Sequence, residues 1–421
     1  MSIDLSSFGQ WYARPSGIGD LMDDLGQALA TGRSDLLMLG GGNPALIPEV
    51  VATWKRRMET LVADDQALAR VLGIYDPPQG NPGFLETLAG FLSQEYGRPV
   101  GVENLAITHG AQTAFYYLFN ALAGENGNQI LFPITPEYIG YAEQGLQGRL
   151  FRSALPRIEE LDDHTFKYRI DFENLPLDEG TAALCVSRPT NPSGNVLTDG
   201  EMERLASLAR ERGIPLLIDN AYGLPFPGAV FTQAAPHWDE HTILTLSLSK
   251  LGLPGTRTGI VVGPPKIIRL VSSLNAVVGL ANNNLGQALT QPLFADGTIA
   301  RLSREIIQPY YRAKAEAASA ILRSALPGDL PWTLHSSEGA FFLWLRCRDL
   351  PISSQALYQR LKARGVLVVP GESFFYNLPR EHRAWRHRKE CLRISFAMED
   401  AVVEEGLARL AKEVTNAYRQ A

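Results

Sequence analysis

The sequence predicts an α/β protein in which helices cover both faces of a mostly parallel sheet, followed by a smaller α/β unit. Six short apolar runs between about residues 100 and 265 each end in a turn-like polar or glycine cluster, as buried parallel strands do. Stretches of helical character lie between them, and such alternation is typical of a wound sheet. At 421 residues the chain also exceeds what one hydrophobic core usually fills, so two domains are expected.

The elements of the first unit follow one another in a regular order. Residues 111–124 are apolar throughout and end in a glycine, while residues 199–213 begin with a candidate cap at Asp199 and end at Gly213, so both stretches are predicted helices. The six predicted strands are LAITHG, QILFPITP, ALCVSRPTNPSG, PLLIDNAYG, TILTLSLSK and GIVVG.

The pattern changes after about residue 300. Residues 302–328 predict one long helix, interrupted near Pro309, with Leu302, Ile306 and Tyr310 along one apolar stripe. Four further stretches predict the smaller α/β unit, namely GAFFLWLRC, SSQALYQRLKARG, VLVVPG and CLRISFA.

Composition excludes several functional classes. Thirty-nine basic and 45 acidic residues give a net charge of −6, which provides no general attraction for nucleic acid or anionic membranes. Three cysteines are too few for a disulfide framework, and no CxxC pair or Cys/His cluster indicates a metal site. The first residues lack the pattern of a secretory signal, and no apolar run is long enough to span a bilayer. We therefore expect a cytoplasmic protein without a metal.

One lysine stands out in the stretch LSLSKLGLPGTRTG, residues 246–259. Lys250 follows an apolar run and is expected at the end of a strand, partly desolvated. Burial and a nearby cation both lower the pKa of an amine, which makes it a nucleophile toward carbonyls. Arg257 offers a planar fork that suits phosphate, and Ser247 adds a hydroxyl. A P-loop does not fit, because no GxxxxGK[ST] motif is present and this lysine precedes its glycines.

Other polar groups stand at the ends of predicted strands, where ligands of open α/β sheets bind. Gly110, Ala111 and Gln112 open a helix whose free N–H groups could cradle a phosphate, although a plain tight turn is the commoner meaning of such a pattern. Asp219 ends an apolar strand, where an ionised carboxylate needs a cation or a donor, and Tyr222 follows three residues later. A helix cap is an equally good interpretation of Asp219.

These groups together fit a single ligand. A phosphate would bind to the helix N-terminus, the hydroxyl and the arginine. An aldehyde would react with Lys250, and a pyridinium would pair with Asp219. Pyridoxal 5′-phosphate carries all three groups, and its ring accepts electrons from a carbanion. The sequence therefore predicts this cofactor.

The order and spacing of six motifs resemble the class I/II aminotransferases, the fold-type I family of pyridoxal phosphate enzymes. The motifs are YDPPQGNPGFLETLAGFL, ITHGAQTAF, RPTNPSGN, IDNAYG, SLSKLGLPGTRTG and LRIS. The resemblance covers nearly the whole chain. It implies a large cofactor-binding domain over residues 49–300 with a seven-stranded, mostly parallel sheet. Residues 1–48 plus 301–421 would form a small domain that closes over the substrate.

The resemblance also assigns roles to the catalytic candidates. Lys250 would form the Schiff base with the cofactor and then carry the proton between the substrate Cα and the cofactor. Asp219 would pair with the protonated ring nitrogen. Tyr222 and Asn191 would hydrogen-bond the ring oxygen, and Tyr138 would stack on the ring.

The remaining candidates would bind phosphate and substrate. Tyr75 would reach the phosphate from the partner subunit, which implies a homodimer with shared sites. Arg393 would clamp the substrate carboxylate, helped by Asn191 and the backbone of Gly42. On its residues alone, an arginine in the pattern CLRISFA would more often be an edge-strand charge. The phosphate would be held by Gly110, Ala111, Gln112, Ser247 and Arg257.

The implied reaction is a ping-pong transamination between L-valine and pyruvate, giving 3-methyl-2-oxobutanoate and L-alanine. Another small-neutral-amino-acid aminotransferase, a C–S lyase or a decarboxylase would use the same lysine. A regulator that keeps the fold as a sensor would typically carry an extra DNA-binding segment. The basic segment 379–393 could indicate nucleic acid, but a solvated loop before a strand is expected. His109 is expected to pack or cap rather than to act as an acid or base.

Overall fold

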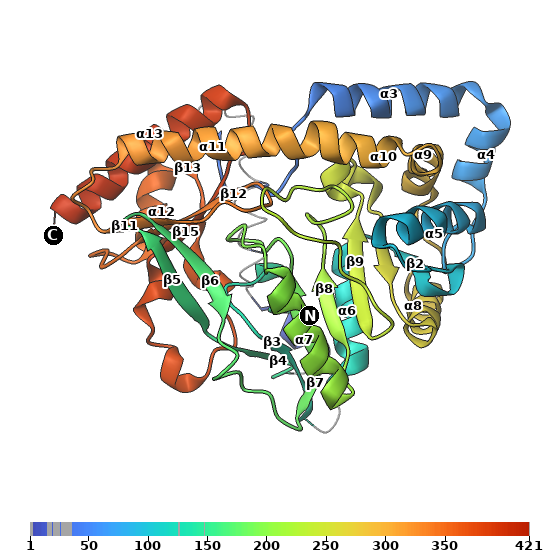
Figure 1. The fold of residues 1–421 in the computed structure, drawn as a ribbon, viewed down its shortest axis with the longest axis horizontal. Helices are drawn as coiled ribbons and strands as arrows, with labels where there is room; N and C mark the ends of the chain where they lie inside the picture. The colour runs from blue at the N-terminus through green and yellow to red at the C-terminus, as the bar shows by residue number, and fades with distance from the viewer. Residues whose placement is uncertain are drawn as a thin grey trace.

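The structure is a computed structural model that describes residues 3–14, 19, 26, 36–124, 127–146 and 148–420. A seven-stranded sheet and a six-stranded sheet organise the molecule, and long helices run alongside both (Figure 1). A third, two-stranded sheet pairs β1 (Leu37–Met38) in parallel with β13 (Val366–Leu367), which joins the N-terminal segment to the C-terminal part of the chain.

The seven-stranded sheet has the strand order β2-β10-β9-β8-β7-β3-β4. All neighbours are parallel except β10, which is antiparallel to both β2 and β9. The predicted α/β class with a mostly parallel seven-stranded sheet is thus confirmed. Six strands coincide with the predicted runs, whereas the three-residue edge strand β4 was not predicted. Their bounds are β2 (Leu105–Thr108), β3 (Gln129–Phe132), β4 (Phe151–Ser153), β7 (Thr181–Ser187), β8 (Leu216–Asp219), β9 (Thr242–Ser247) and β10 (Gly259–Val262).

Both faces of this sheet are buried, which explains why its strands read as continuous apolar runs. Successive side chains of a strand point to opposite faces, so Ala183 and Cys185 of β7 join one core, while Leu184 and Val186 join the other. Figure 1 shows α6 and α7 on opposite sides of the sheet. The first core is closed by α6 (Ala111–Leu122) and α8 (Pro265–Val278), and the second by α5 (Pro82–Tyr96), α7 (Asp199–Arg212) and α9 (Asn284–Ala295).

The six-stranded sheet has the order β14-β15-β12-β11-β6-β5 and draws on two distant parts of the chain. The hairpin of β5 and β6, which the sequence did not predict, lies between β4 and β7 in the chain. It joins the C-terminal strands through parallel pairing of β6 with β11. The bounds are β5 (Pro156–Asp162), β6 (Thr165–Ile170), β11 (Trp332–His335), β12 (Phe342–Cys347), β14 (Val369–Pro370) and β15 (Cys391–Ser395).

A buried ion pair ties this second sheet to the loop that carries Asn191. Lys167 of β6 donates to the carboxylate of Glu338 and also to the carbonyl oxygen of Val196 (3.0 Å). The N–H of Val196 donates to Glu338 Oε2 at 3.0 Å. Because each charge has a partner, their mutual attraction offsets the free-energy cost of burying the two charges. The junction fixes the two sheets to each other next to the Asn191 loop.

The remaining helices pack around the two sheets, with α3, α10 and α11 forming the long upper edge in Figure 1. In the part of the chain that the structure describes, no helix combines the length and the apolar character needed to cross a bilayer. The bounds are α1 (Ser7–Tyr12), α3 (Pro48–Ala63), α4 (Asp65–Gly73), α10 (Thr298–Arg301), α11 (Gln308–Ala325), α12 (Ser354–Ala363) and α13 (Asp400–Arg419).

The predicted start of α7 is shifted by one residue. Thr198, not Asp199, is the N-cap: its hydroxyl accepts from the N–H of Glu201 (3.2 Å), and the Glu201 carboxylate accepts from the N–H of Thr198 (2.9 Å). This reciprocal pair is a capping box. Asp199 instead forms an ion pair with Arg188 (2.6 Å). The predicted end is confirmed, because Gly213 closes the helix in the left-handed conformation, with φ of 64°.

The predicted stripe of the long helix is also corrected. Residues 302–307 form a π-helix, η6, which runs directly into α11. A π turn adds a residue to the repeat, so the buried apolar side chains next after Leu302 are Ile307 and Tyr311, while Ile306 and Tyr310 are only partly buried. The interruption expected near Pro309 therefore takes the form of this π-helix.

The division into a large domain, residues 49–300, and a small domain, residues 1–48 plus 301–421, stays a prediction. Residues 1–2, 15–18, 20–25, 27–35 and 421 of the predicted small domain lie outside the described residues.

Candidate active site

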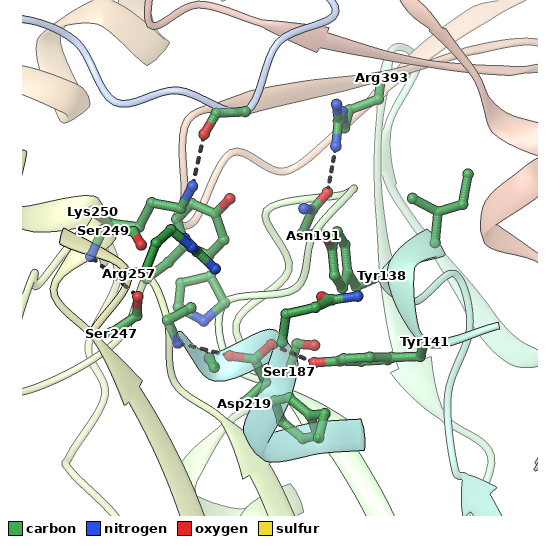
Figure 2. A pocket seen from close by; sticks show the side chains of 18 residues that line it. Tyr138, Tyr141, Ser187, Asn191, Asp219, Ser247, Ser249, Lys250, Arg257 and Arg393 are labelled. Atoms are coloured by element: carbon green, nitrogen blue, oxygen red, sulfur yellow. Dashed lines mark hydrogen bonds between the residues drawn. The ribbon is translucent and has the colours of Figure 1, made fainter. Parts of the chain in front are cut away.

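A cavity of about 200 Å³ lies at the carboxyl ends of β7, β8 and β9 (Figure 2), where the topology of an open α/β sheet places ligands. Of the site residues predicted from the sequence, all except Gly110 and Tyr75 line this cavity. Those that line it are Gly42, Ala111, Gln112, Tyr138, Asn191, Asp219, Tyr222, Ser247, Lys250, Arg257 and Arg393.

Lys250 lies in η4 (Ser249–Leu251), the short 3₁₀ turn that follows β9. Its Nζ donates to the carbonyl oxygen of Gly42 at 2.7 Å. Burial, and next the positive charge of Arg393, lower the pKa of Lys250 to about 8, against the opposing charge of Asp219. An amine with this pKa is partly neutral near pH 7 and is a competent nucleophile.

Asp219 ends β8 and presents its carboxylate to the cavity. The hydroxyl of Tyr141 donates to Oδ2, and the N–H of Ala221 donates to Oδ1 at 2.9 Å (Figure 2). Burial raises the pKa of Asp219, while the bond from Tyr141 and the charge of Lys250 both lower it. Hydrogen bonds of this kind favour the ionised form. The carboxylate is therefore held in place by two donors and keeps lone pairs for a ligand.

Arg393 comes from β15, which lies between β14 and β12, so it is not an edge-strand charge. Its Nη1 donates to Asn191 Oδ1 (2.8 Å) and its Nη2 to the carbonyl oxygen of Gly40 (2.7 Å). Its Nε is buried without a partner among the described residues. Burial lowers the pKa of Arg393 to about 10. The role of the Gly42 backbone toward the substrate stays a prediction; Gly42 lines the cavity, and its carbonyl oxygen accepts from Lys250.

The predicted phosphate-binding groups gather where β2 runs into α6. Gly110 is the N-cap of α6, and the N–H groups of the first turn point out of the helix end. A Cβ at Gly110 would lie 2.3 Å from Arg257 Nη2, so the guanidinium lies directly against this glycine. Ser247 lines the same end of the cavity and accepts from the N–H of Ser249 at 3.1 Å, which leaves its own proton free to donate. Helix N–H groups, a guanidinium and a hydroxyl at one end of the cavity are groups that suit an anion.

Two tyrosines form aromatic walls of the cavity. The buried Tyr222 ring packs edge-on against Phe341 and Phe342, with centroids 5.0 and 5.9 Å away. Tyr138 packs edge-on against Tyr141 at 5.2 Å. Flat apolar walls next to an anion site and a carboxylate suit a planar ring that carries an anion.

Comparison with known proteins agrees with this geometry. Residues 35–410 match the family model of aminotransferase class I and II. The chain belongs to this family. It is similar to the valine–pyruvate aminotransferase of Escherichia coli (strain K12), with 44% identity over 419 residues that cover 99% of each chain. The chain is an aminotransferase.

Two solved structures are similar over almost the entire length. A protein from Psychrobacter arcticum 273-4 superposes with a TM-score of 0.96 at 43% identity, covering 100% of both chains. The valine-pyruvate aminotransferase from Salmonella typhimurium LT2 superposes with a TM-score of 0.88 at 43% identity, covering 96% of this chain and 100% of that one. These structures confirm the fold predicted for an aminotransferase of this family.

Several side chains of the aminotransferase cavity were missed by the sequence analysis. Tyr141 is three residues after Tyr138 in the same motif. The contact of Tyr141 with Asp219 is what distinguishes the two tyrosines. Ser249 lines the cavity immediately before Lys250. Its position in the motif SLSK offered a signal, because a hydroxyl beside a strand-end lysine faces the same loop.

Tyr75 lies away from the cavity of this aminotransferase chain, and of the basic segment 379–393 it is Arg393 that lines the cavity. The Tyr75 side chain is 79% exposed and does not line the cavity. In the segment 379–393, Arg388 pairs with Glu372 (2.9 Å), and Arg386 pairs with Glu390 (3.1 Å). These ion pairs fit the loop interpretation better than a nucleic-acid surface, because both arginines are already paired with acidic side chains of the same chain.

Proposed function

We propose that the chain is a pyridoxal 5′-phosphate-dependent aminotransferase that transfers the amino group between L-valine and pyruvate, giving 3-methyl-2-oxobutanoate and L-alanine. The observation that carries the proposal is one cavity that holds Lys250, Asp219 and Arg393 together. Two relatives at 44% and 43% identity, from two organisms, bear the name valine–pyruvate aminotransferase, which supports the choice of substrates.

The donors and acceptors of the cavity fit the cofactor. Asp219 is an anion for the ring nitrogen, and Lys250 is a nucleophile for the aldehyde. Gly110, whose missing Cβ leaves space for the Arg257 guanidinium, forms a cradle for the phosphate together with Ala111 and Gln112. Ser247 adds a hydroxyl to this cradle, while Asn191 and Tyr222 would donate to the ring oxygen and Tyr138 would stack on the ring. When bound, the cofactor ring accepts the electron pair that the substrate Cα releases.

The protein side chains orient the substrate and handle its proton. Arg393 would take the substrate carboxylate with its planar fork, in exchange for the carbonyl oxygen of Gly40. Lys250, with a pKa of about 8, can accept a proton at the substrate Cα and give it back near neutral pH. Both half-reactions use the same cavity, so the 2-oxo acid product leaves before the second 2-oxo acid enters, and ping-pong kinetics follow.

The charges of the cavity favour small neutral substrates. In the lining that the structure describes, the arginines are Arg257 and Arg393, which the phosphate and the substrate carboxylate occupy in this proposal. A side-chain carboxylate would then find no further arginine. Valine and alanine differ only in apolar groups, worth about 0.8 kcal/mol per buried CH₂, so one modest apolar pocket accepts both.

The proposal includes a homodimer in which Tyr75 of one copy reaches the phosphate site of the other. Leu72, Ile74 and Tyr75 are 73%, 53% and 79% exposed, and Val277 and Val278 are 84% and 65% exposed. Exposed apolar side chains of this kind are candidates for the interface between the two copies. Light scattering should give twice the chain mass, and Tyr75→Phe should weaken cofactor binding. The cytoplasmic location expected from the sequence stays a prediction.

A half-reaction screen tests the substrates. Each amino acid is added to the holoenzyme, and absorbance follows the conversion of the cofactor to its pyridoxamine form. Valine and alanine should convert it, and pyruvate should restore it. Release of ammonia, sulfide or carbon dioxide would identify a lyase or decarboxylase instead.

Two measurements on Lys250 test the chemistry. Borohydride reduction and peptide mapping should locate the cofactor on this side chain, and Lys250→Ala should lose both turnover and the yellow colour. Normal turnover of Lys250→Ala would contradict the proposal.

A further inference from the structure

Glu137 is a buried carboxyl group that the proposed chemistry leaves without a role. Its side chain is 0% exposed, and none of the described cations forms an ion pair with it. It accepts hydrogen bonds from the N–H of Ser187 (2.8 Å), the hydroxyl of Ser187 (2.6 Å) and the N–H of Tyr138 (3.2 Å). Burial raises the pKa of Glu137 to about 8. Three donors thus hold a carboxyl group that has no counter-ion among the described residues.

The three hydrogen bonds join two walls of the active site. Ser187 is the last residue of β7 and is the register partner of Asp219 in β8. Glu137 begins the turn that leads to η3 (Ile139–Tyr141), and its own N–H donates to the carbonyl oxygen of Phe374 (3.1 Å). The carboxyl group therefore clamps this turn to the end of β7, next to Asp219.

The clamped turn places Tyr141 on Asp219. The Tyr141 ring stacks on Phe132 at 5.8 Å, with an angle of 8° between the planes, and its hydroxyl donates to the Asp219 carboxylate. The turn is closely packed, since a Cβ at Gly140 would lie 2.4 Å from the Tyr138 ring. A shift of the turn would carry the Tyr141 hydroxyl away from Asp219.

We propose that Glu137 is a positioning residue for Asp219: it fixes the turn 137–141 to the end of β7 and so holds the Tyr141 hydroxyl on the carboxylate that faces the cavity. The inference rests on the proposed function and adds to it a support for the cofactor's anionic partner. Loss of the Tyr141 bond lets burial raise the pKa of Asp219 further. The carboxylate then protonates at a higher pH, and the cofactor is released at a higher pH as the solution is acidified.

The groups that face this pair from neighbouring elements belong to several parts of the chain. The charge of Glu137 contributes to the raised pKa of Tyr141, Cys185 and Tyr376. The titratable or charged groups near Glu137 or Asp219 are Tyr138, Tyr141, Cys185, Tyr222, Lys250 and Tyr376.

The test measures the dissociation constant of pyridoxal phosphate from the purified enzyme as a function of pH, in Glu137→Gln, Tyr141→Phe and the double variant. Each single variant should bind the cofactor about tenfold to hundredfold more weakly, the range expected for a hydrogen bond to a charged group. Each should also release it at a higher pH than the wild type. Because both act on one contact, the double variant should match Tyr141→Phe rather than the product of the two effects.

Tyr376→Phe is the matched control. Its hydroxyl is buried but has no partner among the described residues, and its ring packs on Phe132 from another side at 5.5 Å. It should keep the wild-type constant and pH profile. Wild-type binding by folded Glu137→Gln would overturn the inference, as would multiplying effects in the double variant. If Glu137→Gln does not fold, Ser187→Ala removes one of the clamping bonds, and unchanged binding by that variant overturns the inference equally. A wild-type enzyme that binds no cofactor would instead refute the proposed function.

Discussion

Gly110→Ala, at the start of α6, should lower both the stability of the protein and its affinity for the cofactor. Gly110 has φ of 83° and ψ of 160°, a conformation that other residues adopt only at a cost of about 1–3 kcal/mol. The added Cβ would also lie 2.3 Å from Arg257 Nη2 and 2.9 Å from Cζ. Arg257 is exposed, so its flexible side chain would swing away. The lost charged contact with phosphate is worth about 1.5–3 kcal/mol, which is roughly a 10- to 150-fold weaker affinity.

The assay pairs urea unfolding of the apoenzyme with titration of pyridoxal phosphate. Gly213→Ala is the control, since Gly213 also has a positive φ, 64°, but no atom lies within 4 Å of its Cβ position. It should lose about 1 kcal/mol of stability and bind the cofactor normally. The reasoning is refuted if Gly110→Ala binds as tightly as the wild type, or if both variants lose affinity equally.

Three further predictions concern the substrate-binding Arg393, the nucleophile Lys250 and the helix cap Thr198. Arg393→Lys loses the planar fork, so kcat/KM for valine should fall about 100-fold, or about 2.7 kcal/mol, while cofactor affinity stays unchanged; equal initial rates would contradict this. Only the neutral amine of Lys250 captures the cofactor, and its pKa is lowered to about 8. The capture rate by the apoenzyme should therefore rise with pH and level off above about 8, and a stopped-flow midpoint near 10 would be inconsistent with the site. Thr198→Ala removes the cap that accepts from Glu201 and should cost about 0.5–2 kcal/mol in urea unfolding, with no change in cofactor affinity.

The strands of the large sheet could be predicted because each has a local signature. A run such as residues 242–247 is buried on both faces and ends where the site begins, so pattern and function coincide. The edge strand β4 has only three residues and carries no such signature. The hairpin β5–β6 is rich in charged residues, and its pairing with β11 joins segments about 170 residues apart in sequence, which no local pattern encodes.

The candidate site divides in the same way. Lys250 and Asp219 end apolar strands, so their chemistry could be inferred from their immediate neighbours. Glu137 and Tyr141 could not be, because their roles depend on how one turn packs against β7 and β8. The contact of Arg393 with the carbonyl oxygen of Gly40 was missed for a similar reason: adjacent glycines look alike in sequence, and only the path of the backbone distinguishes them.

The pairing of β6 with β11 limits how this protein can be recombined with its relatives. A chimera that exchanged only residues 301–421 would take β11 from one parent and β6 from the other, and it would take Lys167 and Glu338 from different parents. The crossover would also leave Val196 facing a foreign carboxylate. An exchange that keeps these contacts within one parent must therefore transplant residues 156–196 along with the C-terminal segment.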